Sequence, residues 1–341
     1  MYPASFNTQP LDTMLVKRSW RWHNLLDFPK LTAIIQIVRG KGKIAAALVV
    51  MAGLLWAAPF QSDEFFLPGA PIPAGAGGNS TVIDWGGLSA ESNPALMTQI
   101  PGRTAALSGA NMWSSLVDLA RGGVVIPAND FSLGAGVFLL SGDGIKITSL
   151  ADLDQPISPQ NYPQVVDEKG HYTLALTLAG AKKFGKLSLG AAAKLVRKKL
   201  TSVSAYGFSL SAGMLWQPAE PLNVGIFARD ISTYQLFWDD GVRETGMPSL
   251  SAGISYSLPR MGKWRVQLAP EISWGPDDGV GFLRLGAVVS YANTFAISVG
   301  TQDGSFTSGA QIKFGAFSLG ASGGYHLSLG GSYAVALGYE F

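Results

Sequence analysis

The chain has 341 residues, enough for one large domain, and 47% of them are hydrophobic whereas only 14% are charged. Soluble domains carry about 25% charged residues, so this composition is poor in charge, and a net charge of +2 argues against a nucleic-acid partner. The absence of cysteine excludes disulfides and thiolate metal sites. Beyond residue 60 no apolar run reaches the ~20 residues of a membrane-spanning helix, which argues against a helical membrane bundle.

Residues 38–58 have the pattern of a signal peptide. Basic residues between Arg39 and Lys43 precede an apolar run over 44–55, and small residues follow it. An uncleaved inner-membrane anchor is the alternative interpretation. Residues 1–37 make this leader much longer than usual. We therefore expect them to be a disordered extension or the product of an incorrect translation start, with the true start at the head of the signal peptide.

Residues 59–102 form a lead-in rich in glycine and proline. Its glycines are not a phosphate loop, because no Gly-Lys-Ser/Thr sequence follows them. Near its end, Asn93, Pro94 and Ala95 predict a short helical turn with the asparagine as N-cap and the proline at the first helical position. This step either shapes a plug or gate or only caps a turn.

The C-terminal stretch shows the pattern that dominates residues 103–341. Every second residue is large and apolar, and the residues between are small or polar; the apolar row is Tyr333, Val335, Leu337, Tyr339 and Phe341. Successive side chains of a strand point to opposite faces, so such a strand has one apolar wall and one small or polar wall. A membrane-spanning antiparallel β-barrel needs this alternation, with apolar groups toward lipid. We expect Tyr339 and Phe341 to be the C-terminal signal that the barrel-assembly machinery reads.

Similar strands of about ten residues recur between short turns through this region, and aromatic residues fall near their ends. Two polar stretches, Asp152 to Lys169 and Trp238 to Pro248, are expected to be loops. A soluble β-sandwich also alternates, but its solvent face would here consist of glycine, serine and alanine with few charges. The fold class expected is therefore all-β, a membrane barrel.

Alternation places four charged residues on the polar wall, which faces the lumen: Arg265, Glu271, Arg284 and Lys313. Charges in a barrel lumen either line a pathway or pair with one another and anchor an internal segment. The sequence shows no Ser-His-acid arrangement and no set of metal ligands, and His171 and His326 fall at strand ends. We expect neither an enzyme nor a cofactor.

Several segments resemble the PorV/PorQ-like family of outer-membrane proteins, which is itself similar to the FadL-type channels. They are Ser92 to Ala95, Leu187 to Gly190 with Lys194 and Leu195, Asn223 to Ile226, Leu250 to Tyr256, and the aromatic C-terminus. The resemblance implies a barrel of about 14 strands with a short N-terminal plug, in the outer membrane of a Gram-negative-type bacterium. Two features depart from the family pattern: the segment Thr81 to Gly87 and the pair Arg229-Asp230.

Two functions remain open at this stage. The first is a passive channel for small hydrophobic compounds. The alternative is a PorV-like component of a protein secretion or surface-attachment system without transport activity of its own. The partners expected are outer-membrane lipid, the barrel-assembly machinery, and either hydrophobic small molecules or secretion-system proteins.

Overall fold

The structure is a computed structural model that describes residues 65, 67, 69–275, 282–302 and 304–341, all of which belong to one compact unit. The expectations for the leader, residues 1–58, lie outside the described part. No helix in the described ranges is long and apolar enough to cross a bilayer.

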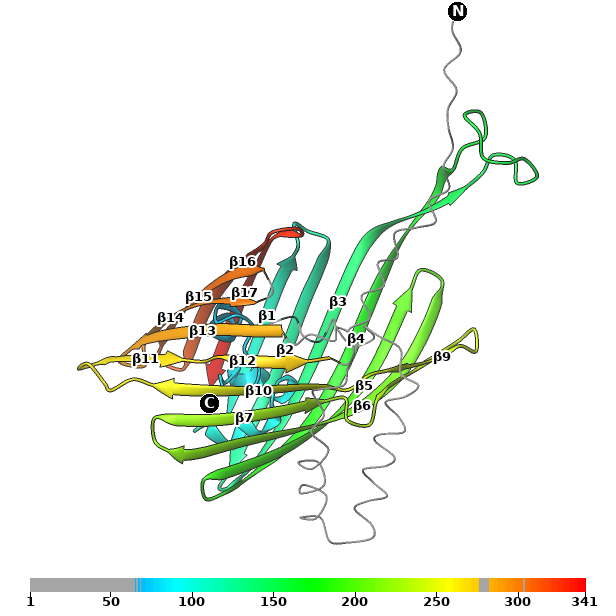
Figure 1. Ribbon diagram of the computed structural model, residues 1–341. Coiled ribbons are helices and arrows are strands. Elements are labelled where there is room, and N and C mark those ends of the chain that lie inside the picture. The colour runs from blue at the N-terminus through cyan, green and yellow to red at the C-terminus, as the bar shows by residue number, and fades with distance from the viewer. Residues whose placement is uncertain (1–64, 66, 68, 276–281, 303) are drawn as a thin grey trace, which may run out of the picture. The chain divides into compact units, whose positions relative to one another are not determined.

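One antiparallel sheet contains all the described strands and closes on itself, because β1 pairs with β2 on one side and with β17 on the other (Figure 1). The strands are β1 (Thr104–Met112), β2 (Val117–Ala128), β3 (Phe131–Ser149), β4 (Gln164–Phe184), β5 (Leu187–Leu200), β6 (Val203–Ala219), β7 (Leu222–Arg229), β8 (Tyr234–Trp238), β9 (Arg243–Gly246), β10 (Ser249–Ser257), β11 (Trp264–Leu268), β12 (Glu271–Trp274), β13 (Phe282–Tyr291), β14 (Phe295–Gln302), β15 (Ser305–Phe314), β16 (Phe317–His326) and β17 (Gly330–Glu340).

Three pairs of these strands continue one another along the wall. Strands β7 and β8 both pair with β6, and β11 and β12 both pair with β13. In the same way β9 pairs with β8, and β10 pairs with β7. When each such pair is counted as one wall strand, the structure is a closed barrel of 14 antiparallel strands, which confirms the predicted fold class.

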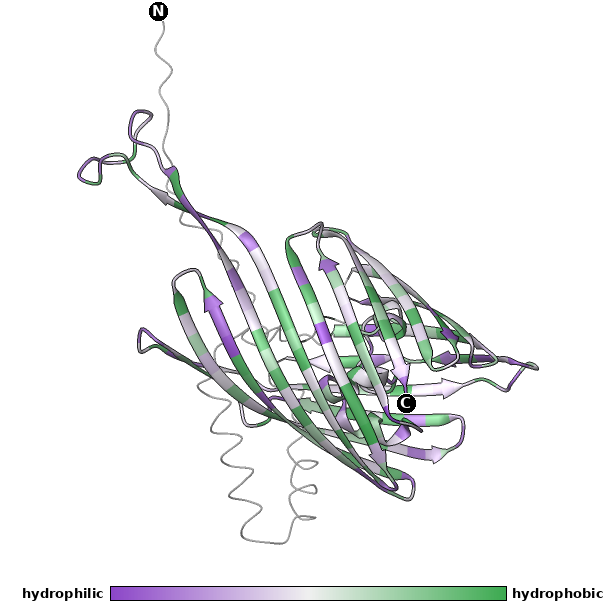
Figure 2. Ribbon diagram, turned by 180° about the vertical axis from the view of Figure 1, so that it is seen from behind, coloured by the Kyte–Doolittle hydropathy of each residue, from purple (hydrophilic) through white to green (hydrophobic). Residues whose placement is uncertain are grey.

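The outer face of the barrel is apolar, as the alternation predicted. On β17, Tyr333, Val335, Leu337 and Tyr339 are exposed, whereas Ala334 between them is buried. Figure 2 shows apolar residues recurring along the strands of the wall. An apolar outer belt of this extent would be unstable in water and is suited to lipid.

Two predicted loops contain additional strand. Residues 164–169 pair with 145–149, so that β3 and β4 form a hairpin that rises beyond the neighbouring strands (Figure 1). Residues 243–246 form β9. Both expectations were wrong for the same reason: these segments are polar because they have water beside them, and polarity alone does not distinguish such strands from loops.

Residues 69–102, which we call the lumen segment, lie inside the ring of strands. The segment contains α3 (Pro71–Gly75) and two 3₁₀ helices, η2 (Gly86–Glu91) and η3 (Pro94–Gln99). Helix α3 contacts β14 to β17, η2 contacts β1 to β4, and η3 contacts β2 to β6. The segment thus touches most of the circumference of the wall.

The two ends of the barrel differ. At one end, which we call the turn end, β2–β3, β4–β5, β6–β7 and β15–β16 are joined by tight turns at 129–130, 185–186, 220–221 and 315–316. At the other end, the loop end, the connections include 113–116 and the long loop 150–163. In outer-membrane barrels the short turns face the periplasm and the longer loops face the exterior.

Candidate functional site

Asn93 fastens the lumen segment to the wall. Its Oδ1 accepts a hydrogen bond from the Ala95 N–H at 3.1 Å, so it caps η3, with Pro94 at the first helical position. Its Nδ2 lies 3.0 Å from the carbonyl oxygen of Thr81 and 3.1 Å from that of Met214 on β6. The side chain is fully buried. Asn93 therefore caps the predicted turn and also joins the lumen segment to the wall; a role in a plug or gate stays a prediction.

The wall is adapted to this close approach. A Cβ at Gly213 on β6 would lie only 1.8 Å from Asn93 Oδ1, and a Cβ at Gly190 on β5 would lie 2.6 Å from the Ala95 nitrogen. Glycine leaves room for the Asn93 side chain at position 213 and for the backbone of the lumen segment at position 190. Part of the unusual glycine content thus serves contact between the segment and the wall.

Glu271 on β12 makes a second attachment. Its carboxylate accepts hydrogen bonds from the Ser80 N–H at 2.8 Å and from the Thr81 N–H and hydroxyl at 2.9 and 2.8 Å. It also forms an ion pair with Arg284 on β13 at 2.7 Å, and both side chains are buried. A buried carboxylate is tolerated when it is paired and hydrogen-bonded in this way.

A third attachment joins η2 to the wall. Glu91 pairs with Arg121 of β2, and the guanidinium also donates to the Leu67 carbonyl. Arg121 lies over the Phe138 ring, 4.6 Å from its centroid. Burial raises the pKa of the Glu91 carboxyl, whereas the adjacent Arg121 lowers it. The neighbouring cation therefore offsets part of the cost of placing a carboxylate here.

The other candidates lie near the turn end. Arg265 lines a cavity there, and Lys313 lines the same cavity while pairing with Glu340 at 2.6 Å in an exposed ion pair. Tyr339 and Phe341 face outward with their rings stacked, and the Phe317 ring lies against Tyr339. Of the four predicted lumen charges, the structure brings only Glu271 and Arg284 together.

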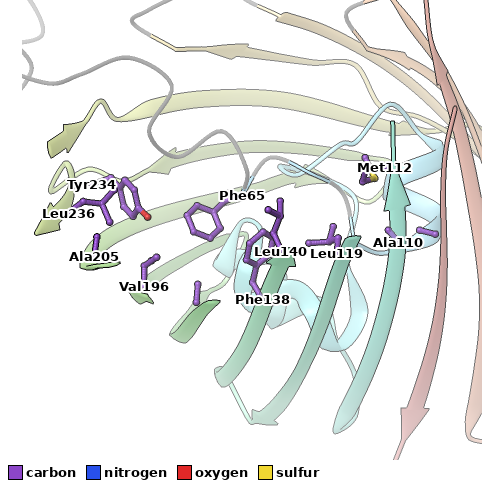
Figure 3. Packing of buried hydrophobic residues seen from close by; sticks show 12 residues of the cluster. Phe65, Ala110, Met112, Leu119, Phe138, Leu140, Val196, Ala205, Tyr234 and Leu236 are labelled. Carbon is purple, nitrogen blue, oxygen red and sulfur yellow. The ribbon is translucent and has the colours of Figure 1, made fainter. Parts of the chain in front are cut away.

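Phe65 occupies an apolar cluster in the lumen toward the loop end (Figure 3). Its ring lies 4.9 Å from that of Phe138 and 6.0 Å from that of Tyr234, and only 4% of the residue is exposed. We call this group the Phe65 cluster; its buried members are Phe65, Ala110, Met112, Leu119, Phe138, Leu140, Ala175, Val196, Ala205, Tyr234, Leu236 and Ala334. An aromatic ring of the chain is thus held by apolar side chains of the wall.

Two cations face this cluster: Arg121, which lies over the Phe138 ring, and Lys194. The Lys194 Nζ lies 3.7 Å from the centroid of the Phe65 ring, which is a cation–π contact, and 4.0 Å from the Asp230 carboxylate. Lys194 and Asp230 are both buried. Lys194 and the Phe65 ring thus form a buried cation–π contact in an otherwise apolar site.

The wall is irregular beside Lys194. Residues 230–233 separate β7 from β8 and lie outside the regular ladder with β6. Asp230 and Thr233 have left-handed backbone conformations, with φ of 56° and 63°. The break is bridged by a hydrogen bond of 2.7 Å from the Ile231 N–H to the Leu210 carbonyl. Hydrogen bonds from the Leu210 N–H to Ser232 Oγ at 2.9 Å and from the Asp230 N–H to Ser211 Oγ at 3.2 Å also cross it, so the regular ladder is interrupted but not open next to the Phe65 cluster.

A polar cavity lies on the opposite side of the lumen segment. Its volume is about 1390 Å³, and it opens at the turn end. Its lining is mixed: polar side chains such as Gln99 and Gln267 predominate, beside apolar ones such as Val82, Ile100 and Val288. The lumen segment thus separates an apolar cluster near the loop end from a polar cavity near the turn end.

Sequence reasoning missed Phe65, Glu91, Arg121 and the role of Lys194. Arg121 lies in a stretch that alternates poorly, and Phe65 lies in a lead-in without periodicity. The signal that could have found the lysine is its parity: in β5 it occupies the small, inward row, where a buried cation needs a partner.

No protein-family model matches the sequence, and no curated protein matches it. Among solved structures, the chain is similar to the toluene transporter TodX of P. putida, with 13% identity and a TM-score of 0.58. It is also similar to the toluene transporter TbuX of Ralstonia pickettii, with 12% identity and 0.55, and to the CymD monoaromatic hydrocarbon channel, with 14% and 0.57. Each alignment covers 81% of this chain and 98% or 99% of the other.

The chain has the fold of these channels. The similarity extends over almost the whole length of each neighbour, so it concerns the complete barrel and not a single hairpin. At this level of identity the likeness concerns the fold, and the substrate has to be argued from the side chains of this chain.

Proposed function

We propose that the chain is an outer-membrane channel for the passive entry of small hydrophobic compounds, with monocyclic aromatic hydrocarbons as its substrate class. The observation that carries the proposal is the Phe65 ring, which fills an apolar, cation-capped site in the lumen. A ligand ring of similar size would occupy this site when Phe65 leaves it. The fold shared with a toluene transporter and a monoaromatic hydrocarbon channel supports this substrate class.

The location follows from two features. The apolar outer belt suits a bilayer, and barrels of this kind belong to outer membranes. On this basis we propose that the chain is a FadL-type channel. We attribute its resemblance to the PorV/PorQ-like family to sequence features that outer-membrane barrels share.

The exit route we propose runs through the wall and not past the lumen segment. Three attachments, through Asn93, Glu271 and Glu91, hold that segment, and the cavity beyond it is polar. A hydrocarbon gains nothing by entering a polar cavity. The break at 230–233 borders the Phe65 cluster and faces lipid on its outer side, so it is the shorter apolar path.

Uptake by cells tests the proposal, because lipopolysaccharide makes the outer membrane the barrier that such a channel would bypass. Cells that lack their own hydrocarbon channel should take up labelled toluene faster when they produce this chain. Ala205→Phe, which fills the Phe65 cluster, should lower the rate, whereas Ala193→Phe on the exposed outer face should leave it unchanged.

Val196→Phe provides a second filled variant, and heat-modifiable gel migration checks that each barrel has folded. Uptake equal to that of cells without the chain would refute the channel. Equal rates in the Ala205→Phe and Ala193→Phe variants would refute the site.

A role in secretion or surface attachment is the second candidate, and one observation favours it. Residues 145–149 and 164–169 of the β3–β4 hairpin pair only with each other, and their loop exposes Leu153 and Ile157. Deletion of residues 150–163 distinguishes the two functions. If the chain is a channel, the deletion variant should still take up toluene. If the chain is a secretion component, its cells should show no toluene uptake with or without the deletion, and the deletion should abolish export of surface proteins.

A further inference from the structure

Three basic side chains cluster on the outer face of the barrel near its loop end. Arg197 and Lys199 lie on β5, and Arg243 lies on β9, all of them exposed. Strand β5 buries Lys194 and Val196 and exposes the residues between them, so the first two cations continue the outward row. They face the surroundings of the barrel and not its lumen.

The register of four adjacent strands brings these residues together. Arg197 lies opposite Tyr206 of β6, Tyr206 lies opposite Phe237 of β8, and Phe237 lies opposite Arg243. The Arg197 guanidinium lies 5.6 Å from the centroid of the Tyr206 ring, and that of Arg243 lies 5.7 Å from the centroid of Phe237. We call Arg197, Lys199, Tyr206, Phe237 and Arg243 the outer cationic patch.

The patch lies at the boundary of the apolar belt that is nearer the loop end. One step from the patch toward the turn end, the outward row continues with Leu195 on β5 and Phe208 on β6, both exposed. Outward residues near the loop end of the opposite wall are Thr301, Phe306, Tyr325 and Tyr333, none of them charged. The cations are therefore concentrated on one side of the barrel.

Within the described residues, no acidic side chain forms an ion pair with Arg197, Lys199 or Arg243. In the turn between β8 and β9, the Asp239 carboxylate accepts a hydrogen bond from the Ser204 N–H at 3.1 Å, and that of Asp240 accepts one from the Val242 N–H at 3.0 Å. Glu168, further along the β3–β4 hairpin, lies opposite Lys146. The guanidiniums remain available to anions from outside the chain.

We propose that the outer cationic patch binds the phosphate groups of a multiply phosphorylated, multiply acylated lipid of the outer leaflet, whose acyl chains lie on Leu195 and Phe208. Guanidinium groups bind phosphate in a bidentate manner, and stacking on an aromatic ring orients them for it. Arg197 and Arg243 are three strand spacings apart, roughly 14 Å between their backbones, which fits two phosphates better than one. The inference rests on the outer-membrane location within the proposed function.

Native mass spectrometry of the barrel released from detergent tests this binding. The probes are lipid A with two phosphates, its monophosphorylated form, and phosphatidylglycerol. The variant carries Arg197→Gln, Lys199→Gln and Arg243→Gln. The matched control carries Lys182→Gln, Arg260→Gln and Lys263→Gln, which remove the same charge from exposed residues at the turn end.

The wild type and the control should retain lipid A with two phosphates, and the patch variant should retain about 10- to 100-fold less, since each basic residue near a charged membrane surface contributes measurably. Equal retention by the patch variant and the wild type would overturn the proposal. The proposal would also be overturned if the wild type retained phosphatidylglycerol as well as lipid A, or if free phosphate fully displaced lipid A. Either result would indicate a site for any anion. Gel migration confirms folding, and toluene uptake is measured separately, so failure of this inference is distinguishable from failure of the channel.

Discussion

Two ion pairs of the same type differ in what they contribute to stability. Glu271 and Arg284 are paired in the barrel interior, with side-chain exposures of 0% and 3%, whereas Lys313 and Glu340 pair at the surface, with 44% and 49%. Solvent and salt weaken an exposed pair, but a buried charge that loses its partner stays desolvated. The two pairs have similar N–O distances, so their difference in burial determines which of them contributes more to the stability of the barrel.

Glu271→Gln should destabilise the barrel by about 3–5 kcal/mol, because it breaks the buried ion pair with Arg284 and weakens the attachment of Ser80 and Thr81. Lys313→Gln, the matched control, should cost about 0–1 kcal/mol. Urea unfolding of the folded barrels in lipid vesicles measures both. Adding Arg284→Gln to the first variant should recover part of the loss; equal effects of the two single substitutions would contradict this account of burial.

If the proposed function holds, Lys194 should give the lumen site a preference for aromatic rings, through its cation–π contact. Toluene that replaces Phe65 exchanges one cation–π contact for another, whereas methylcyclohexane, of nearly the same size, loses the contact. Lys194→Met combined with Asp230→Asn removes both charges of the pair together. The ratio of toluene to methylcyclohexane affinity should then fall about 2- to 30-fold, as expected for a contact of about 0.5–2 kcal/mol.

Competition binding with the two solutes measures this ratio, with Lys182→Met at the turn end as the control. When Phe65 is kept, the ratio should fall because methylcyclohexane binds more tightly: in the double variant this solute displaces a Phe65 ring that the lysine no longer holds. In a Phe65→Ala background the fall should come from weaker binding of toluene. An unchanged ratio in both backgrounds would exclude Lys194 from selectivity.

At the scale of elements, the lumen segment is fixed at several points along its length. Asn93 attaches it to β6, Glu271 attaches it to β12, and Glu91 attaches it to β2. Each attachment is buried and would leave polar groups unsatisfied if it broke. The segment is thus built to remain in place while solute passes.

A disulfide tests whether it does. A Cβ at Gly134 on β3 would lie 3.0 Å from the Ala90 Cβ on η2, and the flexible Met97 thioether, 2.5 Å away, has to shift to admit it. The usual Cβ–Cβ separation in a disulfide is about 3.5–4.5 Å, which requires a small adjustment. The chain has no cysteine of its own, so the pair Ala90→Cys and Gly134→Cys forms without competition.

Toluene uptake by the oxidised double variant should equal that of its reduced form, because the proposed route passes through the break at 230–233. Each single cysteine variant controls for the substitution itself. Loss of uptake on oxidation with recovery on reduction would show that the lumen segment moves, and would contradict exit through the wall.

Alternation was enough to predict most of the strands, though not β9 or the outer part of β4, and the inward side of Glu271 and Arg284. Glu271 and Arg284 were placed on the lumen face by parity alone, and the structure has them there. Their contacts with Ser80 and Thr81 could not be predicted, because periodicity says nothing about which distant segment fills the lumen. Phe65 shows the same limit: a single ring in an aperiodic lead-in acquires its role only when the barrel closes around it.

At the scale of the whole molecule, the barrel joins an apolar outer belt, an apolar cluster in the lumen and a break in the wall between them. On the proposed route a hydrocarbon would move from one apolar environment to another, while the lumen segment separates the cluster from the cavity at the turn end. The same closure places the outer cationic patch on the strands that border the break, since β6, β8 and β9 contribute to both.

The most direct test of this account follows Phe65 itself. 4-Fluorophenylalanine at position 65, in barrels embedded in nanodiscs, reports by ¹⁹F NMR whether the ring leaves its cluster when toluene is added. We predict a saturable shift of the resonance toward its solvent-exposed value, none with glucose, and no saturable shift from the same label at the lipid-facing Phe317. A resonance at position 65 that stays unchanged while toluene crosses the membrane would contradict the account.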